Sequence, residues 1–440
     1  MSAAAPASTD IRALLDRAPM SQAQIIAVLI VGALSALDGY DVLAISFAGP
    51  GVSHEWGLGP TGLGLVFSSG LAGMGLGALF LAPFADTLGR RALIFITLSL
   101  MAVGMLCSAF AGNVGMLAAC RVLTGIGIGA MVPVINPLSA EYPNAKRRAL
   151  GVAVMAIGYP IGGTLGGFAA AWLLHLYGWP SVFLLGAAVA LLMFPVVHFW
   201  MPESPAFLLE RQDADSLPKL NALLARFGHG PVEALPDTAA PTRIPYGEIF
   251  ATGQRGRTLW IAVVNFLFVI TVYYVLSWMP QLVAARGFSP SEGTMISAIC
   301  NGAGVAAGLT VGLVAARMSV RWLVAALMVG LGLTTFLFGH APASFGALAA
   351  MAALAGICLF GAVSGLYGTV AASFPARIRA TGAGFVTGLG RGGSALAPFI
   401  AGALFSLGVE RGGVSLAMGA AAALGGLILL LPVGKSAARI

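Results

Sequence analysis

Two carboxylates stand three residues apart in the first long apolar segment of the chain. Asp38 and Asp41 lie inside a run from about residue 25 to residue 47 that is otherwise nearly free of charge. On a helix this spacing puts both side chains on one face. A carboxylate at membrane depth costs about 3 kcal/mol on insertion scales, so such residues usually face the interior of a bundle and have a function. We expect this pair to take up and release protons.

Two arginines are the other charges expected at membrane depth. Arg121 and Arg391 fall inside apolar segments, and Arg391 stands among glycines with no acid near it in the sequence. A planar guanidinium binds a carboxylate through two parallel hydrogen bonds, so Arg391 is the candidate anion-binding group. A buried ion pair that joins two helices is the alternative. For Arg121 the two interpretations are equally open.

The composition indicates a polytopic membrane protein. The chain is 58% hydrophobic and 9% charged, whereas soluble domains are about 25% charged. Its basic residues fall in short loops rather than on one face, so we expect no nucleic-acid partner. The 4 cysteines are scattered through apolar segments without disulfide or metal-type spacing. We expect no metal and no cofactor, with protons as the coupling ion.

Twelve apolar runs reach the length of about 20 residues that a membrane helix needs. They are 24–47, 61–83, 92–111, 115–136, 149–174, 180–201, 257–283, 292–316, 321–340, 345–372, 380–406 and 412–434. This predicts an all-α polytopic protein with two six-helix bundles, and we expect the polar stretch between them to form short amphipathic helices on the inner surface. The predicted units are a cytoplasmic tail 1–23, a bundle 24–201, a cytoplasmic loop 202–256, a bundle 257–434 and a cytoplasmic tail 435–440.

The distribution of Lys and Arg predicts the orientation. With both termini inside, 19 of the 23 basic residues lie in inner segments and only Arg286 and Arg411 lie in outer loops. We therefore expect a multi-pass protein of the cell (inner) membrane with both termini in the cytoplasm.

Helix rise then gives the depth of each charge. Asp41 lies about 9 Å below the outer end of its predicted helix, and Arg121 is expected at the same level. Arg391 is expected about 16 Å from the inner end of its helix, near the midplane. These depths favour a proton site, with Asp41 as acceptor and Asp38 as its partner, separate from the anion site.

A weak internal repeat relates the two halves. Pro143 and Pro375 each follow a long apolar run, and each is followed by basic residues and a glycine-rich helix. Tyr159 and Arg391 stand sixteen residues after these prolines, so we expect them to face each other across the interface between halves.

Aromatic side chains in the same helices offer walls for an aromatic ring. The aromatic residues in helices that can line a cavity are Tyr40, Tyr159, Tyr273, Tyr274, Trp278, Tyr367 and Phe385. Of these, Tyr40, Tyr159 and Tyr274 are the candidate binding residues, and ordinary packing or anchoring at the interface is the alternative for each of them.

Three motifs carry a resemblance to a known superfamily. The segment 82–91, with Asp86, Gly89, Arg90 and Arg91, resembles the helix 2–3 motif of the major facilitator superfamily, although Ala82 and Thr87 replace its usual Gly and basic residue. Segment 121–125 resembles the helix 4 arginine motif of that superfamily, and segment 203–205 resembles an element of its sugar and organic-acid porters. The resemblance implies the major facilitator fold, with two pseudo-symmetric halves that alternate access.

The segment 38–41, Asp-Gly-Tyr-Asp, narrows the resemblance. It is similar to the Asp-Gly-x-Asp element of the aromatic acid:proton symporters, and Glu141 and segment 377–391 fit the same family. The resemblance implies proton-coupled import of a benzoate-like or hydroxybenzoate-like acid, such as 4-hydroxybenzoate or protocatechuate. Its partners are then a small aromatic carboxylate and the lipid bilayer, and we expect a monomer.

The charged residues at the inner surface have two interpretations. Asp86, Gly89, Arg90 and Arg91, together with Glu141, are expected to form a latch that keeps the inner side closed while the outer side is open. Orientation by positive charge alone is the alternative.

Other functions remain as alternatives. The chain is also compatible with a carrier of another organic acid or a sugar, or with an efflux antiporter, although segment 158–163 does not fit the antiporter element of helix 5 in register. An enzyme or a channel is not expected, because no Ser/His pair, His/Glu metal spacing or ring of pore charges appears.

Overall fold

The computed structural model describes residues 11–211, 213, 215–235, 246–251, 253–315 and 317–432. Residues 1–10 of the predicted tail 1–23, residues 236–245 of the predicted loop 202–256 and the whole predicted tail 435–440 lie outside the described residues. Within the described part the chain forms helices joined by short turns.

The long helices of the first half are α2 (Gln22–Trp56), α3 (Pro60–Leu76), α5 (Arg90–Ala109), α6 (Val114–Glu141), α7 (Arg148–Tyr177) and α8 (Pro180–Trp200). Helix α3 continues through η1 (Gly77–Leu81), η2 (Ala82–Phe84) and α4 (Ala85–Leu88). Those of the second half are α11 (Arg255–Ala284), α12 (Pro290–Ala315), α13 (Val320–His340), α14 (Phe345–Ala372), α15 (Arg379–Ser406) and α16 (Arg411–Leu430). The short ones are α1 (Ile11–Arg17), η3 (Ala145–Arg147), α9 (Pro205–Arg211), α10 (Ser216–Arg226), η4 (Tyr246–Phe250) and η5 (Ala376–Ile378).

Eleven spans in the described part of the chain are long and apolar enough to cross a membrane. The twelfth long helix, α15, has 28 residues but is less apolar, because its middle carries Arg391 among glycines. The predicted fold class is confirmed: two six-helix halves with short helices α9 and α10 between them.

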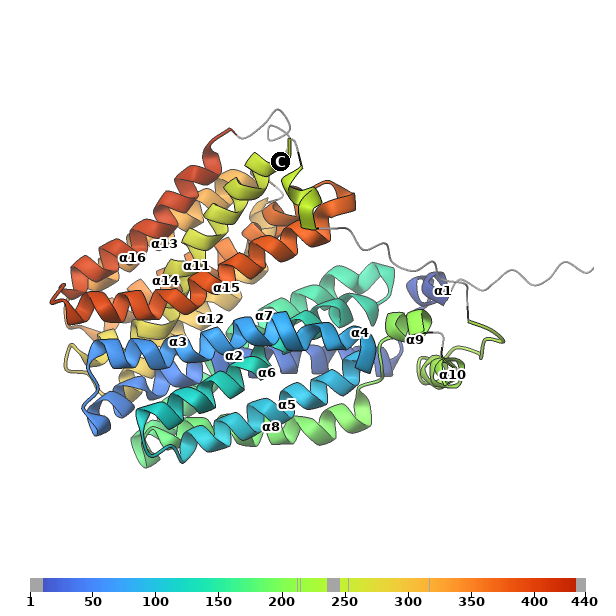
Figure 1. Ribbon diagram of the computed structural model, residues 1–440, viewed down its shortest axis with the longest axis horizontal. Coiled ribbons are helices and arrows are strands. Elements are labelled where there is room, and N and C mark those ends of the chain that lie inside the picture. Colours follow the sequence, from blue (N-terminus) through green and yellow to red (C-terminus); the bar gives the residue numbers. More distant parts are fainter. Residues whose placement is uncertain are drawn as a thin grey trace, which may run out of the picture.

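The two halves meet at one end and diverge toward the other (Figure 1). Helix α3 packs against α15, α7 against α12, and α2 against α11. At the closed end Thr61 Oγ1 and Ser406 Oγ are 2.7 Å apart. The diverging end is the one that carries α1, α9 and α10 (Figure 1). The structure is therefore packed on the side expected to be outer and splayed on the side expected to be inner.

Helix ends follow from local sequence signals. Ser21 and Gln24 form a reciprocal capping box at the start of α2. Asn113 caps α6 by accepting a hydrogen bond from the Met116 N–H, 2.8 Å away. Gly57, with φ of 60°, ends α2 in the left-handed conformation.

Glycines let backbones approach closely inside each half. A Cβ at Gly39 would collide with the backbone carbonyl of Tyr159, and one at Gly162 with that of Ala36, so α2 and α7 are in backbone contact. Gly73 meets Val122 of α6 in the same way. This is the small-residue packing that membrane helices use when burial of apolar surface cannot drive association.

The first membrane helix is longer than predicted. We expected it to end near residue 47 because of the following Gly49-Pro50-Gly51, yet α2 continues through Pro50 to Trp56. Membrane helices tolerate proline where neighbouring groups satisfy the freed carbonyl. Asp41 therefore lies 15 residues before the helix end, about 22 Å along the axis rather than about 9 Å.

Candidate functional site

Arg391 lies at the middle of α15, where the sequence predicted it. It is 12 residues into a 28-residue helix and is partly buried. The glycines around it matter for packing: a Cβ at Gly390 would meet the Asn265 side chain at 2.5 Å, and one at Gly393 would meet Phe266 at 3.2 Å. Close packing of α15 on α11 thus fixes the part of the helix that carries the guanidinium.

Asp38 interacts electrostatically with Arg391 across the interface between halves. Asp38 belongs to α2 and is 2% exposed, and its Oδ1 atom is buried without a hydrogen-bond partner. The two side chains form no direct ion pair. We expected no acid partner for Arg391, since none is near it in sequence, and the partner comes instead from the other half of the fold.

Three tyrosines share this environment. Tyr159 of α7, Tyr273 of α11 and Tyr367 of α14 all interact electrostatically with Arg391. The hydroxyl of Tyr159 is buried without a partner, and its ring lies 6.3 Å from that of Phe360. The structure thus brings Tyr159 and Arg391 together, as the repeat predicted, and places two more of the aromatic residues considered, Tyr273 and Tyr367, near the same guanidinium. Unpartnered polar atoms beside a guanidinium and aromatic rings form an arrangement suited to a polar aromatic ligand.

Asp41 and Arg121 meet inside the first half. The Arg121 Nη2 atom donates to the backbone carbonyl of Asp41 at 2.8 Å, while both carboxylate oxygens of Asp41 lack hydrogen bonds. The guanidinium also lies over the Phe183 ring, 5.7 Å from its centroid, and beside the Met105 sulfur at 3.1 Å. The equal depth predicted for the two charges is observed, but Arg121 is 1% exposed and surrounded by its own half.

Tyr40 and Tyr274 are not brought to this site. The Tyr40 hydroxyl donates to the Val182 carbonyl at 2.6 Å, within the first half. The Tyr274 hydroxyl pairs with Ser415 Oγ at 2.9 Å, within the second half. Successive residues on a helix point about 100° apart, so Tyr273 faces Arg391 while Tyr274 faces the core.

A second cluster joins the predicted inner-gate residues. Arg90 forms an ion pair with Glu141, and Glu141 Oε2 accepts from Ser204 Oγ at 2.6 Å. Glu203 Oε1 accepts from the backbone N–H groups of Arg90 and Arg91, each at 3.1 Å. Glu203 therefore caps the start of α5, a position where a negative charge is stabilising.

Gly89 and Tyr142 make this cluster compact. Gly89 has φ of 97°, and a Cβ there would come within 2.8 Å of Glu203 Oε2. Tyr142 donates to the Pro202 carbonyl at 2.7 Å. Burial, and then the nearby carboxylates of Glu203 and Glu141, raise the pKa of the Tyr142 hydroxyl well above its ordinary value. The hydroxyl therefore stays protonated and remains a donor.

Asp86 is separate from this cluster. It is exposed in α4, and no ion pair or hydrogen bond of its side chain is present among the described residues. The predicted latch is not engaged at Asp86, which agrees with the divergence of the two halves at this end (Figure 1).

Local sequence carries only partial signals for the roles of Tyr273 and Glu203. Tyr273 and Tyr274 are adjacent, and without the helix phase their roles cannot be separated. Glu203 belongs to the porter-like segment 203–205, but its contact with the start of α5 spans 113 residues of chain and has no local sequence signal. Among the described residues no group of three or more His, Cys, Asp or Glu could hold a metal ion.

A comparison with protein-family models decides the family. Residues 28–398 match the model of the Major Facilitator Superfamily. The chain belongs to the major facilitator superfamily. The match spans both halves, from within α2 to within α15, and so includes the residues around Arg391.

Curated relatives of this superfamily member carry names that specify cargo. The chain is 31% identical to a gallate transporter of Pseudomonas putida over 402 residues, covering 90% of this chain and 89% of the relative. It is 30% identical to a 4-hydroxybenzoate transporter of Acinetobacter baylyi, and the match covers 90% of this chain and 88% of the relative. It is also 30% identical to a 3-(3-hydroxy-phenyl)propionate transporter of Escherichia coli, covering 84% of each chain.

Solved structures of the superfamily share its fold. A D-xylose-proton symporter superposes with a TM-score of 0.71 at 17% identity, over 94% of this chain and 98% of that one. An inward-open xylose transporter of Escherichia coli superposes with a TM-score of 0.71 at 18% identity, over 94% of this chain and 97% of that one. At this identity the likeness concerns the fold alone.

Proposed function

We propose that this protein is a proton-coupled symporter that imports an aromatic carboxylate by alternating access. The observation that carries the proposal is Arg391, a cation at mid-depth in the interface between halves, with three tyrosines and one acid around it. The relatives named for gallate, 4-hydroxybenzoate and hydroxyphenylpropionate support this class of cargo.

Arg391 binds the carboxylate of the cargo. A guanidinium is a strong partner for a carboxylate, because two parallel N–H···O bonds form in a site shielded from water. The tyrosines contribute ring surfaces against the aromatic cargo and hydroxyl groups for its ring substituents. The buried, unpartnered hydroxyl of Tyr159 is available for such a bond.

Asp38 couples the cargo to the proton. When the cargo carboxylate binds Arg391, Asp38 loses the positive charge that stabilises its ionised form. A buried carboxylate without a partner is costly, so Asp38 then takes up a proton. Asp38 is in α2 and Arg391 in α15, so this exchange changes the attraction between the two halves. Asp41 and Arg121 lie within one half and keep their arrangement as that half moves.

The membrane potential sets how many protons are useful. Import of a monovalent anion against a negative interior costs about 2.3 kcal/mol per 100 mV. One proton per anion removes this cost, and a second proton makes the potential drive uptake. Asp38 and Asp41 together offer two acids for such a stoichiometry.

The membrane placement follows from the charge distribution. We propose a location in the cell (inner) membrane, with tails 1–23 and 435–440 and loop 202–256 in the cytoplasm and bundles 24–201 and 257–434 in the membrane. In this orientation the diverging end of the structure faces the cytoplasm. That the protein is a monomer is a separate part of the proposal.

Transport by purified protein in proteoliposomes tests the proposal. An acid-outside gradient should drive uptake of labelled 4-hydroxybenzoate, with gallate, benzoate, xylose and a short aliphatic acid as competitors. Arg391→Ala should abolish binding and uptake. Asp38→Asn should keep exchange of cargo across the membrane but lose accumulation driven by the gradient.

Four outcomes would contradict the proposal. Normal uptake by Arg391→Ala would contradict the role of Arg391 as the anion site. Gradient-driven accumulation by Asp38→Asn would contradict the role of Asp38 in proton coupling. Competition by xylose or a short acid, but not by aromatic acids, overturns the cargo class. Accumulation only in the reverse direction indicates an efflux antiporter.

A further inference from the structure

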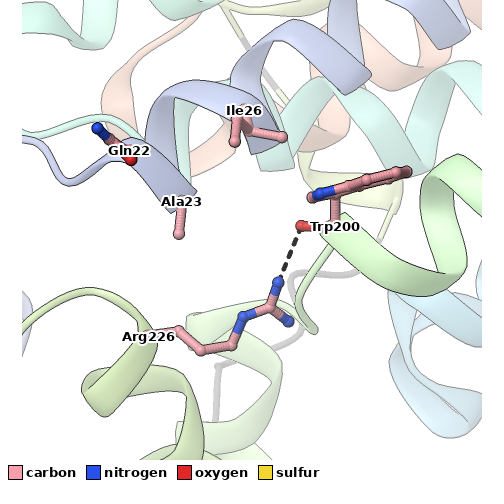
Figure 2. Close-up of a pocket in the computed structure, with 5 residues that line it drawn as sticks. All are labelled: Gln22, Ala23, Ile26, Trp200 and Arg226. Atoms are coloured by element: carbon pink, nitrogen blue, oxygen red, sulfur yellow. Dashed lines mark hydrogen bonds between the residues drawn. The ribbon is translucent and has the colours of Figure 1, made fainter.

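A cavity of about 440 Å³ lies at the inner end of the first half. It is lined by Gln22, Ala23 and Ile26 of α2, by Trp200 at the end of α8, and by Arg226 at the end of α10 (Figure 2). None of these residues belongs to the site around Arg391 or to the cluster around Glu203. The cavity therefore needs an explanation of its own.

Arg226 supplies a positioned cation. Its Nη2 atom donates to the carbonyl oxygens of Phe199 and Trp200, both at 3.3 Å, so the guanidinium is held at the last turn of α8. Figure 2 shows the side chain reaching from α10 toward Trp200. The Nε and Nη1 atoms form no hydrogen bond with the described residues, and no carboxylate lines the cavity. One edge of the guanidinium is thus free for an oxygen-rich anion.

The opposite wall of the cavity is formed by α2, with polar Gln22 at its start and the apolar side chains of Ala23 and Ile26 after it. Ile26 is 38% exposed, and Leu29, on the same face one turn further along the helix, is 58% exposed. Trp200 is 49% exposed at the end of a membrane helix, where tryptophan marks the level of lipid headgroups. The cation therefore lies at headgroup level, directly below a face of α2 suited to acyl chains.

We propose that this cavity binds an anionic phospholipid of the inner leaflet, with its phosphate on Arg226 and its acyl chains along Ile26 and Leu29. A soluble phosphate would use the guanidinium but not the apolar face. A zwitterionic lipid would bring an ammonium group for which the cavity has no acid. The proposal rests on the cytoplasmic placement of this end and is independent of the cargo.

Native mass spectrometry of the full-length transporter tests this site. The protein is titrated with phosphatidylglycerol, and with phosphatidylcholine in a parallel series. Arg226→Gln removes the cation, and Ala23→Trp fills the cavity while leaving Arg226 in place. The matched control is Lys219→Gln on the same helix, since Lys219 is exposed, pairs with Asp215 at 3.3 Å and does not line the cavity.

Loss of one charge-assisted interaction should weaken phosphatidylglycerol binding about tenfold in Arg226→Gln, and Ala23→Trp should weaken it similarly. Lys219→Gln should bind as the parent does. Equal binding of phosphatidylglycerol by Arg226→Gln and the parent overturns the proposal. So does binding of phosphatidylcholine to the parent that is as strong as its binding of phosphatidylglycerol. Displacement of the lipid by millimolar inorganic phosphate would make this a soluble-anion site instead. Because the measurement reports lipid binding, a failed uptake assay leaves its result unchanged.

Discussion

The two aspartates of α2 occupy different electrostatic surroundings although three residues separate them. Asp38 interacts with Arg391 of the second half, whereas Asp41 lies beside Arg121 of its own half. An acid whose partner belongs to the other half experiences any relative movement of the halves. An acid whose partner moves with it does not. This difference, rather than depth in the membrane, favours Asp38 as the coupling group.

The adjacent tyrosines of α11 give a matched pair of substitutions. Tyr273→Phe removes a hydroxyl that interacts with Arg391, so we expect the affinity for a hydroxylated aromatic acid to fall about fivefold to tenfold. Tyr274→Phe removes the hydrogen bond to Ser415 and should lower stability by about 1 kcal/mol without changing that affinity. Binding isotherms and thermal unfolding of both variants check this. The reverse assignment of effects would show that Tyr274, not Tyr273, contacts the cargo.

The sequence identified the charged residues of the site but not which of them meet. Asp38, Asp41, Arg121 and Arg391 are recognisable because a charge in an apolar segment is rare and costly. The electrostatic interaction of Asp38 with Arg391 depends on how the two halves dock. No local pattern encodes their proximity, so the proton and anion sites that the sequence analysis expects to be separate come together at Asp38 in the proposed mechanism.

At the scale of elements, turn chemistry and capping hold the inner end of the first half together. Glu203 follows α8 in the chain but caps α5, and Gly89 provides the space for it. The motif residues Gly89, Arg90 and Arg91 thus have a structural role within one half that does not involve Asp86. Such a task accounts for this motif without requiring contact with the second half.

Substitution of Gly89 tests this structural task. Gly89→Ala forces a residue with a side chain to adopt φ of 97° and places its Cβ near Glu203, so we expect a loss of about 1 to 3 kcal/mol in stability. Gly75→Ala in α3 is the matched control, because a Cβ there meets nothing within 4 Å. Chemical denaturation in detergent micelles measures both. Equal stability of the two variants would show that the turn accommodates a side chain.

Element boundaries were predictable where the polar turns are distinct and were misplaced at two prolines, Pro50 in α2 and Pro137 in α6. The predicted run 345–372 coincides with α14, but α2 passes through Pro50 and ends nine residues beyond the predicted boundary. Proline is a reliable stop signal in water-soluble helices. Inside a membrane bundle the neighbouring helices offset its effect, and these neighbours are not visible in the local sequence.

At the scale of the whole molecule, contacts between the halves are concentrated at the end expected to be outer. Gly64 and Gly402 place α3 and α15 in backbone contact there, and Trp278 packs on Phe67 and Phe405, with ring centroids 5.5 and 5.0 Å away. In alternating access this seal must open when the inner end closes. The close approach of backbones makes the seal sensitive to any added side-chain volume.

Gly64→Val should therefore shift the protein away from this outer-closed state. A Cβ at Gly64 meets the Pro398 carbonyl at 2.6 Å, and a backbone atom cannot move aside as a flexible side chain would. Gly75→Val, again on α3 but facing open space, is the control. Spin labels at Gly112 and Ala343, exposed in outer loops of the two halves, report their separation in a background without the 4 native cysteines.

In Gly64→Val we expect a longer distance between these labels, together with slower uptake, because the variant cannot return readily to the state that releases cargo inside. The control should reproduce the distances of the parent. Unchanged distances in Gly64→Val would mean that the outer seal does not depend on backbone contact between α3 and α15. The aromatic cluster around Trp278 would then have to hold the outer end closed, and Trp278→Ala would be expected to open it instead.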